Sequence, residues 1–500
     1  IMNIVEKAFK NLNFYDSSNE EYELFHFNLN KFDDEYLIVN DTGEYIFVNK
    51  ENLLKLIHKQ INFNTDRIFF NELINKQFIY LKKNKFAIQQ KSFKYRTKKQ
   101  FITTGAVLHL FVVTTRCEHK CKYCQITPQD SLNKLYDMSI ETAKKSVELM
   151  MQFPSNDITV EFQGGETLLS FEIVKEIVHY TNELNKIRNK NIVFVIATSL
   201  VNITDEQLIF IKENNINIST SLDGNENLHN LNRPIKSENT YMKFKEGFFK
   251  AKEITLQMPS PLLTISRFSL NKIDEIIREY LAFNCNSISL RALSPYGFAV
   301  KTKNKIGYTI DEYIEFFSKS LKYIIDLNKS GIYFREDYTT LLLKRILTPY
   351  STGYVDLQSP SGAGLNAIVY HYNGEIYPAD EARMLAEMGD KSFMLGNVHD
   401  TTYDNLINNK KLITLINDSC AESLNECEGC VYLSYCGCDP LFNYVTQNDH
   451  IGHRPTNDFC KKQKAIYKII FDYLKNNDKE TIDIFWSWIN NDFCKEIIND

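Results

Sequence analysis

The stretch Cys117-Glu-His-Lys-Cys121-Lys-Tyr-Cys124 decides how this chain of 500 residues is interpreted. It follows an apolar run from Ala106 to Val113 that predicts a buried strand, so we expect the cysteines on the loop that leaves this strand. A structural zinc ion normally takes four ligands, and so does an ordinary [4Fe–4S] cluster. The motif supplies three thiolates, which would leave one iron of such a cluster open to a small molecule. Part of a zinc site is the alternative.

A second short motif, Phe162-Gln163-Gly164-Gly165-Glu166-Thr167, follows an apolar strand predicted from Ile158 to Phe162. Two adjacent glycines let a backbone approach a ligand closely, because neither carries a Cβ atom. Glu166 then offers a carboxylate to an ammonium group. Taken alone, a Gly–Gly pair after a strand indicates only a turn.

The third motif combines a strand end with a nearby arginine. The stretch Ile218-Ser-Thr-Ser221-Leu-Asp223-Gly ends in polar side chains, and His229-Asn-Leu-Asn-Arg233-Pro follows it. A guanidinium suits a carboxylate ligand because it can donate two parallel hydrogen bonds. On its own, this pattern would indicate a turn with a surface arginine.

The middle of the chain alternates apolar strands with amphipathic stretches. We expect helices at 139–152, 171–188, 204–214, 240–254 and 271–282, and strands at 106–114, 158–162, 191–197, 216–221, 260–266 and 287–291. Thr204-Asp-Glu-Gln has the form of a capping box at a helix start. Alternating strands and helices predict a parallel sheet. Ligands bind at the carboxyl ends of such strands, where all three motifs fall.

Together the three motifs resemble those of the radical SAM superfamily, whose members cleave S-adenosylmethionine (SAM) reductively. The resemblance implies an α/β fold with a partial (β/α)6 barrel at 101–345 and a [4Fe–4S] cluster on Cys117, Cys121 and Cys124. The family's GGEP motif has Thr167 here in place of proline. The resemblance also implies that the following residues lie around the cluster and SAM: Tyr123, which shields the cluster, Gln163, Gly164, Gly165, Glu166, Ser221 and Arg233.

The C-terminal third carries more cysteines, in Cys427-Glu-Gly-Cys430-Val-Tyr-Leu-Ser-Tyr-Cys436-Gly-Cys438 and at Cys460. This pattern resembles the SPASM extension, which usually holds two auxiliary [4Fe–4S] clusters. Four expected ligands of one auxiliary cluster are present: Cys427, Cys430, Cys436 and Cys460. Three ligand positions of the other hold Ser361, Ala379 and Pro440, so we expect that cluster to be lost. A zinc site on the four retained cysteines is the alternative.

Several segments resemble most closely the radical SAM maturase of His-Xaa-Ser peptide systems, one of a pair of radical SAM proteins. They are His229–Pro234, Arg291–Val300, Asp380–Asp390 and Leu395–Val398. The resemblance implies that a 5′-deoxyadenosyl radical removes a hydrogen atom from a ribosomally synthesised peptide. It also implies a reductant such as flavodoxin or ferredoxin, and a companion radical SAM protein, as partners. The alternatives are oxidation of a Ser or Cys in a sulfatase, and a non-catalytic partner of the companion protein.

Asp380 directly follows the lost ligand position at Ala379. In sulfatase-maturing relatives an aspartate at this place takes the proton of the substrate, which makes Asp380 a candidate catalytic residue. The alternative is a structural ion-pair network of Asp380 with Glu381 and Arg383.

The sequence predicts three further parts around the barrel. Residues 1–100 are expected to form a small α+β accessory domain, with a hairpin at 36–48, that either captures a leader peptide by strand addition or covers the barrel. Residues 346–470 are expected to form the SPASM-like extension, and residues 471–500 a helical tail.

Composition limits the function classes. The net charge of −5 comes from 58 basic and 63 acidic residues, which gives no reason to expect nucleic-acid binding. No apolar run is long enough to span a membrane and no secretory signal is visible, so we expect a cytoplasmic protein. In that compartment, 11 cysteines indicate metal binding or catalysis instead of disulfides.

Overall fold

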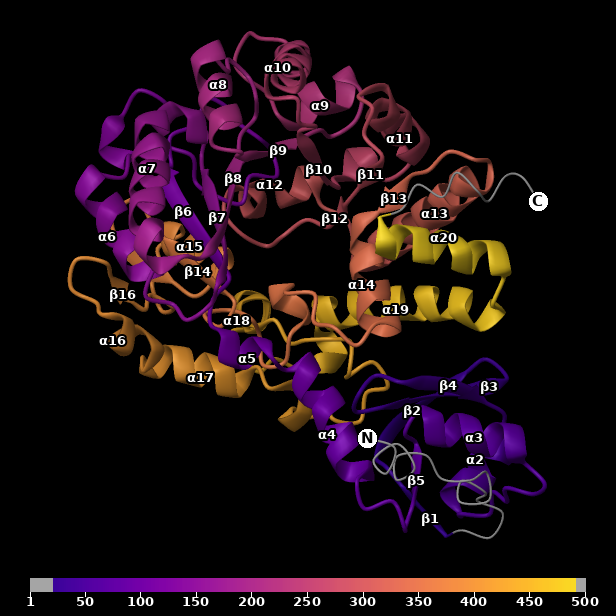
Figure 1. Cartoon of the computed structure of the whole chain (residues 1–500). Coiled ribbons are helices and arrows are strands. Elements are labelled where there is room, and N and C mark those ends of the chain that lie inside the picture. The colour runs from indigo at the N-terminus through magenta and orange to yellow at the C-terminus, as the bar shows by residue number, and fades with distance from the viewer. Residues whose placement is uncertain (1–20, 492–500) are drawn as a thin grey trace, which may run out of the picture. The chain divides into compact units, whose positions relative to one another are not determined.

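The computed structural model describes residues 21–491 (Figure 1). Residues 1–20 of the predicted N-terminal domain and residues 492–500 of the predicted helical tail lie outside the described residues. Two compact units are present. One holds the described residues up to Lys99, with the short segments Ile346–Ser351 and Asn425–Tyr435, and the other holds the rest.

The smaller unit is an α+β domain built on an antiparallel sheet of order β2-β3-β4, and β1 pairs with β5. The predicted hairpin is formed by β3 and β4, which pair antiparallel. Helices α2 and α3 cover a core that includes Leu56 and Phe70. Its elements are β1 (Tyr22–Leu24), β2 (Phe27–Phe32), β3 (Glu35–Asn40), β4 (Tyr45–Val48), α2 (Lys50–Ile57), α3 (Arg67–Asn75), β5 (Ile79–Leu81) and α4 (Ala87–Lys98).

The larger unit is built on a nine-stranded sheet of order β12-β10-β9-β8-β7-β6-β14-β15-β16. From β12 to β14 every pair of neighbouring strands is parallel. The expected fold class, a partial (β/α)6 barrel, is confirmed. Its strands are β6 (Leu108–Thr114), β7 (Asp157–Gly164), β8 (Asn191–Ala197), β9 (Asn217–Ser221), β10 (Ser260–Thr264), β11 (Ser287–Ile288) and β12 (Leu290–Arg291).

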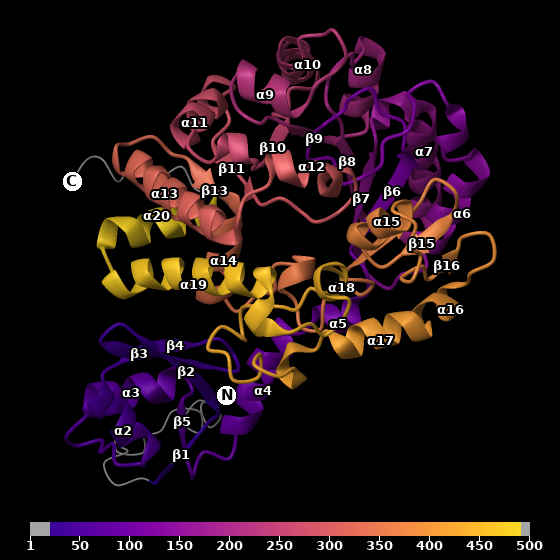
Figure 2. The ribbon, with the colours of Figure 1, turned by 180° about the vertical axis from the view of Figure 1, so that it is seen from behind.

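Helices cover the outer side of this arc of strands, as Figures 1 and 2 show from opposite sides. The capping box predicted at Thr204 and Gln207 is present. The last predicted strand is split, because β11 pairs with β13 (Arg335–Glu336) and β12 with β10. The helices of this part are α5 (Phe101–Thr104), α6 (Ile140–Met150), α7 (Phe171–Arg188), α8 (Asp205–Glu213), α9 (Glu226–Asn232), α10 (Thr240–Thr255), α11 (Ile273–Ala282), α12 (Phe298–Ile306), α13 (Ile310–Lys329) and α14 (Asp337–Leu347).

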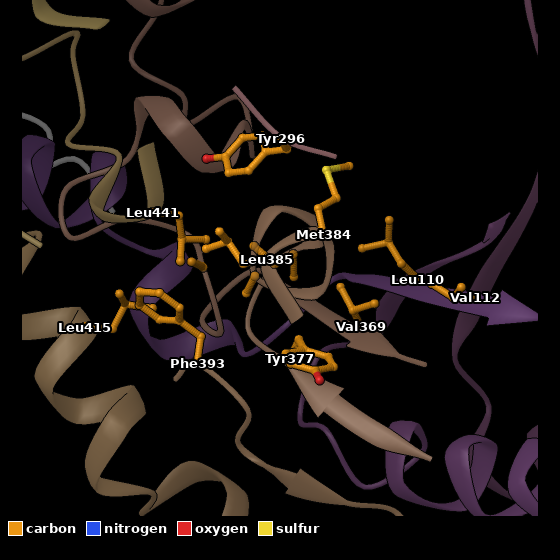
Figure 3. Packing of buried hydrophobic residues seen from close by; sticks show 14 of the residues in the cluster. Leu110, Val112, Tyr296, Val369, Tyr377, Met384, Leu385, Phe393, Leu415 and Leu441 are labelled. Carbon is orange, nitrogen blue, oxygen red and sulfur yellow. The ribbon is translucent and has the colours of Figure 1, made fainter. Parts of the chain in front are cut away.

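The C-terminal extension contributes strands to the barrel sheet, which the sequence did not predict. β14 (Ala367–Tyr370) lies parallel to β6, in register from Ala367 opposite Leu108 to Tyr370 opposite Phe111. β15 (Glu375–Tyr377) and β16 (Gly396–Asn397) continue the sheet antiparallel. A single buried apolar cluster therefore joins β6 and β14 to the helices α15 (Asp380–Glu387) and α18 (Pro440–Gln447) (Figure 3).

The remaining helices are α16 (Tyr403–Ile407), α17 (Lys410–Asp418), α19 (Asp458–Asn476) and α20 (Lys479–Asn490). α19 and α20 pack against α13. α19 runs across residue 471, at which the separate tail was predicted to begin. Within residues 21–491, no helix combines the length and the apolar character that crossing a bilayer requires.

The contact between β14 and β6 includes a buried polar pair that can be tested. His109 Nε2 lies 3.2 Å from the Ala106 carbonyl, which makes Nε2 the protonated nitrogen. The Tyr370 hydroxyl then donates to Nδ1 at 3.0 Å, and neither side chain is exposed. Burial lowers the pKa of His109 to about 3, so the ring stays neutral.

We predict that Tyr370→Phe lowers the free energy of opening of the β14 amides by about 1–3 kcal/mol, because it leaves a buried acceptor unsatisfied. Native-state hydrogen exchange measures this quantity for the segment itself. Tyr350→Phe is the control, since Tyr350 is 68% exposed. Equal opening free energies for the two variants would show that the hydrogen bond between Tyr370 and His109 does not stabilise β14.

Candidate functional site

The loop of three cysteines is anchored at its start by a buried arginine. The Arg116 guanidinium donates two parallel hydrogen bonds to the Asp137 carboxylate, each of 2.7 Å, and a third to the Leu169 carbonyl at 2.6 Å. Arg116 is only 4% exposed. A bidentate pair of this kind fixes orientation as well as charge. The loop therefore leaves β6 in a defined direction.

The same loop is bonded along its length to the segment that carries Arg233. The amides of Lys120 and Lys122 donate to the carbonyls of Pro234 and Asn232, at 2.9 and 2.8 Å. The first and third motifs of the sequence are thus brought together by backbone hydrogen bonds at the carboxyl ends of the strands.

The three thiols lie close enough to influence one another. Burial raises the pKa of Cys117 well above its ordinary value, and Cys121 raises it further. Burial likewise raises the pKa of Cys121, and that of Cys124 to about 12, again with a contribution from Cys121 to the latter. Such thiols become thiolates only when a cation binds and displaces their protons.

Within residues 21–491, no three His, Cys, Asp or Glu side chains crowd closely enough to share a single metal ion. Around one zinc ion two sulfurs are about 3.8 Å apart. A [4Fe–4S] cluster binds each thiolate through a different iron, so its ligands stand farther apart. Three thiols on one loop, one buried and two half-buried, that act on one another are a donor set that fits such a cluster.

The Gly164–Gly165 pair serves a contact between strands. The Gly165 and Glu166 amides donate to the carbonyls of Thr114 and Arg116, at 2.9 and 2.7 Å. A Cβ atom on Gly165 would stand 2.0 Å from the Arg116 carbonyl oxygen, and one on Gly164 would stand 1.9 Å from that of Thr114. The expectation was an approach to a ligand. The glycines here let the end of β7 approach the end of β6.

The Glu166 carboxylate, which is 4% exposed, is held by the next strand end. It accepts hydrogen bonds from the Thr198 hydroxyl at 2.6 Å and the Ser199 amide at 2.9 Å. The Ser199 hydroxyl and the Leu168 amide also donate to it. These four donors use the acceptor sites that a carboxylate offers. An ammonium ligand would have to replace one of them.

A buried trio of polar side chains stands between the cysteine loop and the third motif. The Tyr123 hydroxyl lies 2.7 and 2.8 Å from the two carboxylate oxygens of Asp223, and Arg233 donates to it at 3.0 Å. Burial raises the pKa of Asp223 to about 6, while Arg233 and Tyr123 oppose the shift. The hydroxyl of Tyr123 thus connects the cysteine loop to the Asp223 carboxylate at the end of β9.

The Arg233 guanidinium has donor groups to spare. Within residues 21–491 no carboxylate lies within 4.0 Å of it, and its one side-chain hydrogen bond goes to Tyr123. Its charge helps to lower the pKa of the neighbouring His119 to about 3, although burial is the larger cause, so that ring is neutral. Asp223 acts on Arg233 through its charge, but the guanidinium has no direct carboxylate contact within residues 21–491, so it suits an anionic ligand group.

The other predicted residues are placed as follows. Ser221 ends β9, where it pairs with Leu262, and Gln163 in β7 donates to the Glu161 carboxylate at 2.7 Å. Asp380 starts α15 and accepts from Arg383 Nε at 3.0 Å, and Arg383 also donates to Glu387 at 2.9 Å. Asp380 is thus a member of an ion-pair network.

The predicted ligands of the auxiliary cluster fall in both compact units. Cys427 and Cys430 belong to the smaller unit, Cys436 and Cys460 to the larger one. Their assignment to one cluster therefore rests on their spacing in the sequence.

Several residues of the site were missed at the sequence level. Arg116 and Asp137 form the anchor of the cysteine loop, and Thr198 and Ser199 hold Glu166. The sequence placed Asp223 at a strand end, but it predicted no function for this residue. Polar residues directly after an apolar strand were the available signal, because such positions meet at one edge of a parallel sheet.

Comparisons with known proteins agree with this geometry. The model of the Radical SAM superfamily matches residues 111–279. An uncharacterized protein of Methanocaldococcus jannaschii, MJ0907, is 31% identical over 228 residues, which are 45% of this chain and 72% of that protein. A cysteine-type anaerobic sulfatase-maturating enzyme of Clostridium perfringens is 24% identical over 72% of this chain and 95% of that enzyme.

Two solved structures share the fold. One is anSMEcpe with bound AdoMet, with a TM-score of 0.60 and 19% identity, covering 74% of this chain and 98% of that one. The other is SuiB of Streptococcus suis bound to its precursor peptide SuiA, with a TM-score of 0.52 and 14% identity, covering 87% and 99%. The chain thus belongs to the radical SAM superfamily, with a [4Fe–4S] cluster and SAM as the cofactors of its barrel.

Proposed function

We propose that this chain cleaves SAM and uses the resulting 5′-deoxyadenosyl radical to modify a ribosomally synthesised peptide by hydrogen-atom abstraction. The observation that carries the proposal is Arg233. It lies beside the cysteine loop with no carboxylate of residues 21–491 in salt-bridge distance. The cluster and SAM supply the radical when both are bound, and the protein supplies the ligands and the orientation.

Each proposed contact to SAM uses one chemical property of a side chain. Cys117, Cys121 and Cys124 would hold the cluster. Arg233 would bond the SAM carboxylate with two parallel donors, because Tyr123 is its one side-chain hydrogen-bond partner among residues 21–491. Ser221, at the end of β9, would add a hydroxyl. The backbone of the Gly164–Glu166 turn would complete the site from the end of β7.

A peptide is the proposed substrate class for two reasons. The relatives include an enzyme named for maturing sulfatases, and SuiB is a structural neighbour bound to a precursor peptide. The segments Arg291–Val300 and Asp380–Asp390 also resemble the maturase of His-Xaa-Ser peptide systems. We propose membership in that group, with a companion radical SAM protein and a flavodoxin- or ferredoxin-like reductant as partners.

A sulfatase-type oxidation is the second candidate, because the Clostridium perfringens enzyme aligns over 72% of this chain. Asp380 is the proposed proton acceptor in that case. Its hydrogen bond from Arg383 favours the structural role instead, because this carboxylate is already held by a guanidinium. Two roles proposed at the sequence level remain proposals: leader-peptide capture by the N-terminal domain, and one auxiliary cluster on Cys427, Cys430, Cys436 and Cys460.

The first prediction concerns the cysteine loop. Replacing Cys117, Cys121 and Cys124 by Ala should abolish formation of 5′-deoxyadenosine from SAM and dithionite, while circular dichroism stays that of the parent. The barrel strands pair through backbone hydrogen bonds outside the loop, so the fold should persist. Cys285→Ala is the control, because Cys285 is a buried thiol between α11 and β11, outside the cysteine loop. Cleavage that survives in the triple variant would end the proposal.

The second concerns Arg233. Arg233→Lys should weaken SAM binding to the reconstituted protein about ten- to a hundredfold, because a lysine keeps the charge and loses the two parallel donors, and a charge-assisted bond contributes about 1.5–3 kcal/mol. Equilibrium dialysis with labelled SAM measures the effect. Arg278→Lys, on the exposed face of α11, serves as the matched control. Unchanged affinity in Arg233→Lys would place the SAM carboxylate elsewhere.

The third concerns iron. Two clusters hold about eight irons per chain, against about twelve for a relative with three clusters. Cys427→Ala or Cys460→Ala should therefore remove about four irons and destabilise the segment 420–465, because binding free energy becomes folding free energy in such loops. Iron near twelve would show that the first auxiliary site survives without its cysteines. Iron near four with one zinc would show that the retained cysteines bind zinc.

A further inference from the structure

Three half-buried carboxylates gather in the larger unit, outside the SAM contacts described above. They belong to Asp356, Glu381 and Asp439. Burial is the main cause that raises the pKa of each to about 7, and repulsion from one another is the second. Like charges that lie close together disfavour ionisation of one another.

The three carboxylates flank the three positions at which cysteines of the auxiliary-cluster pattern are missing. Asp356 precedes Ser361 on the same short loop, Glu381 follows Ala379, and Asp439 directly precedes Pro440. The part of the extension that has lost thiolate ligands is therefore lined by acidic side chains.

Packing brings the three loops to one place. Val355, Ala382 and Leu441, each adjacent to or near one of the acids, belong to the same apolar cluster as Tyr296. The backbone at Gly437 also lies so close to the Asp356 carbonyl that a Cβ atom there would stand 2.5 Å from it. The acids are thus adjacent to or near members of one shared cluster in the chain.

The hydroxyl of Tyr296 points at the same group of carboxylates. The side chain is 2% exposed, and its oxygen has no hydrogen-bond partner among residues 21–491. Asp439, Glu381 and Asp356, in that order, are the charges that act on it. Figure 3 shows the hydroxyl directed to the side on which Leu441 lies, two residues after Asp439. A buried, unpaired hydroxyl costs free energy that a ligand can recover.

Two cations also face the acids, and they do not balance them. Arg291 and Lys462 both act on Asp356. Glu161, on β7, adds a fourth carboxylate that feels Arg291, whereas Asp380 is already paired with Arg383. Four carboxylates against two cations leave an excess of negative charge when all are ionised. The phenol of Tyr354 is a further titratable neighbour, and the Cys436 thiol acts on Lys462.

This region borders the cysteine loop. Arg291 donates to the side chain of Gln125 at 3.3 Å, and the Ala299 amide donates to the Cys124 carbonyl at 2.9 Å. The segment that carries Arg291 and Tyr296 therefore runs along the loop that holds the proposed cluster. A group bound among the acids would lie next to the place where the radical forms.

We propose that Asp356, Glu381, Asp439 and Tyr296 form a subsite that binds the basic side chain of a lysine or arginine in the peptide substrate. This inference rests on the proposed function. The apolar walls given by Val355 and Met384 suit the methylene stem of such a side chain, and the carboxylates and hydroxyl suit its charged head. A basic residue bound here sets which substrate residue faces the radical.

The test compares two small probes on the reconstituted holoenzyme with SAM: Nα-acetyl-lysine N-methylamide, whose side-chain ammonium is free, and Nα-acetyl-norleucine N-methylamide, which has the same carbon chain without the ammonium. Saturation-transfer NMR gives the dissociation constant of each. We expect the lysine probe to bind about tenfold more tightly. In the double variant Asp356→Asn, Glu381→Gln this preference should disappear. It should persist in Glu375→Gln, whose carboxylate pairs with Lys391 outside the subsite.

The preference should also rise with pH. The pKa values near 7 mean that the acids are partly protonated at pH 6 and ionised at pH 8, so the lysine probe should gain affinity between the two and the norleucine probe should not.

The same rise in pKa predicts that Glu381→Gln raises the thermal midpoint of unfolding at pH 8 more than at pH 5. A carboxyl with a raised folded-state pKa loses stability as the pH rises through that window.

If the double variant fails to fold, Asp439→Asn replaces it, because asparagine still caps α18 in place of Asp439. Equal affinities of the two probes for the parent protein would overturn the subsite. So would a preference that survives in the acid variants, or displacement of the lysine probe by Mg²⁺ alone. Formation of 5′-deoxyadenosine without peptide is assayed separately, so failure of the proposed function and failure of the subsite give different results.

Discussion

The site depends on one close contact between backbones, where the end of β7 meets the end of β6. The Gly165 and Glu166 amides bond to the carbonyls of Thr114 and Arg116, and side chains on either glycine would collide with those carbonyls. Arg116 in turn clamps Asp137. Because of this contact, the cysteine loop and the Gly–Gly–Glu turn leave the sheet side by side. The Tyr123–Asp223–Arg233 trio then joins them to β9.

Short sequence patterns were enough to predict the barrel and the sheet edge at which its ligands bind. The apolar runs and the Thr204 capping box predicted the strands and a helix start that the structure has. The pairing of β14 with β6 could not be predicted in this way, because the two strands are joined only by long-range hydrogen bonds. The same holds for the donors on Glu166, which come from the next strand end. The glycines were recognised as necessary, but the backbone they approach belongs to the protein.

The proposed acidic subsite and the auxiliary cluster of the SPASM pattern would give the extension different chemistry. The SPASM pattern has cysteines at the positions of Ser361, Ala379 and Pro440, whereas in this chain the carboxylates of Asp356, Glu381 and Asp439 act on the Tyr296 hydroxyl. A metal cluster and an acidic subsite bind chemically different ligands. The first can accept an electron or a substrate donor atom, and the second selects a cation.

The central claim is that the cysteine loop and Arg233 hold a cluster and SAM together. Electron paramagnetic resonance of the reduced, reconstituted protein tests this claim most directly, because SAM that coordinates the open iron changes the signal of that cluster. The account predicts a changed signal on adding SAM to the parent protein, and a signal that needs much more SAM to change in Arg233→Lys. A spectrum that saturating SAM leaves untouched in the parent protein would contradict it.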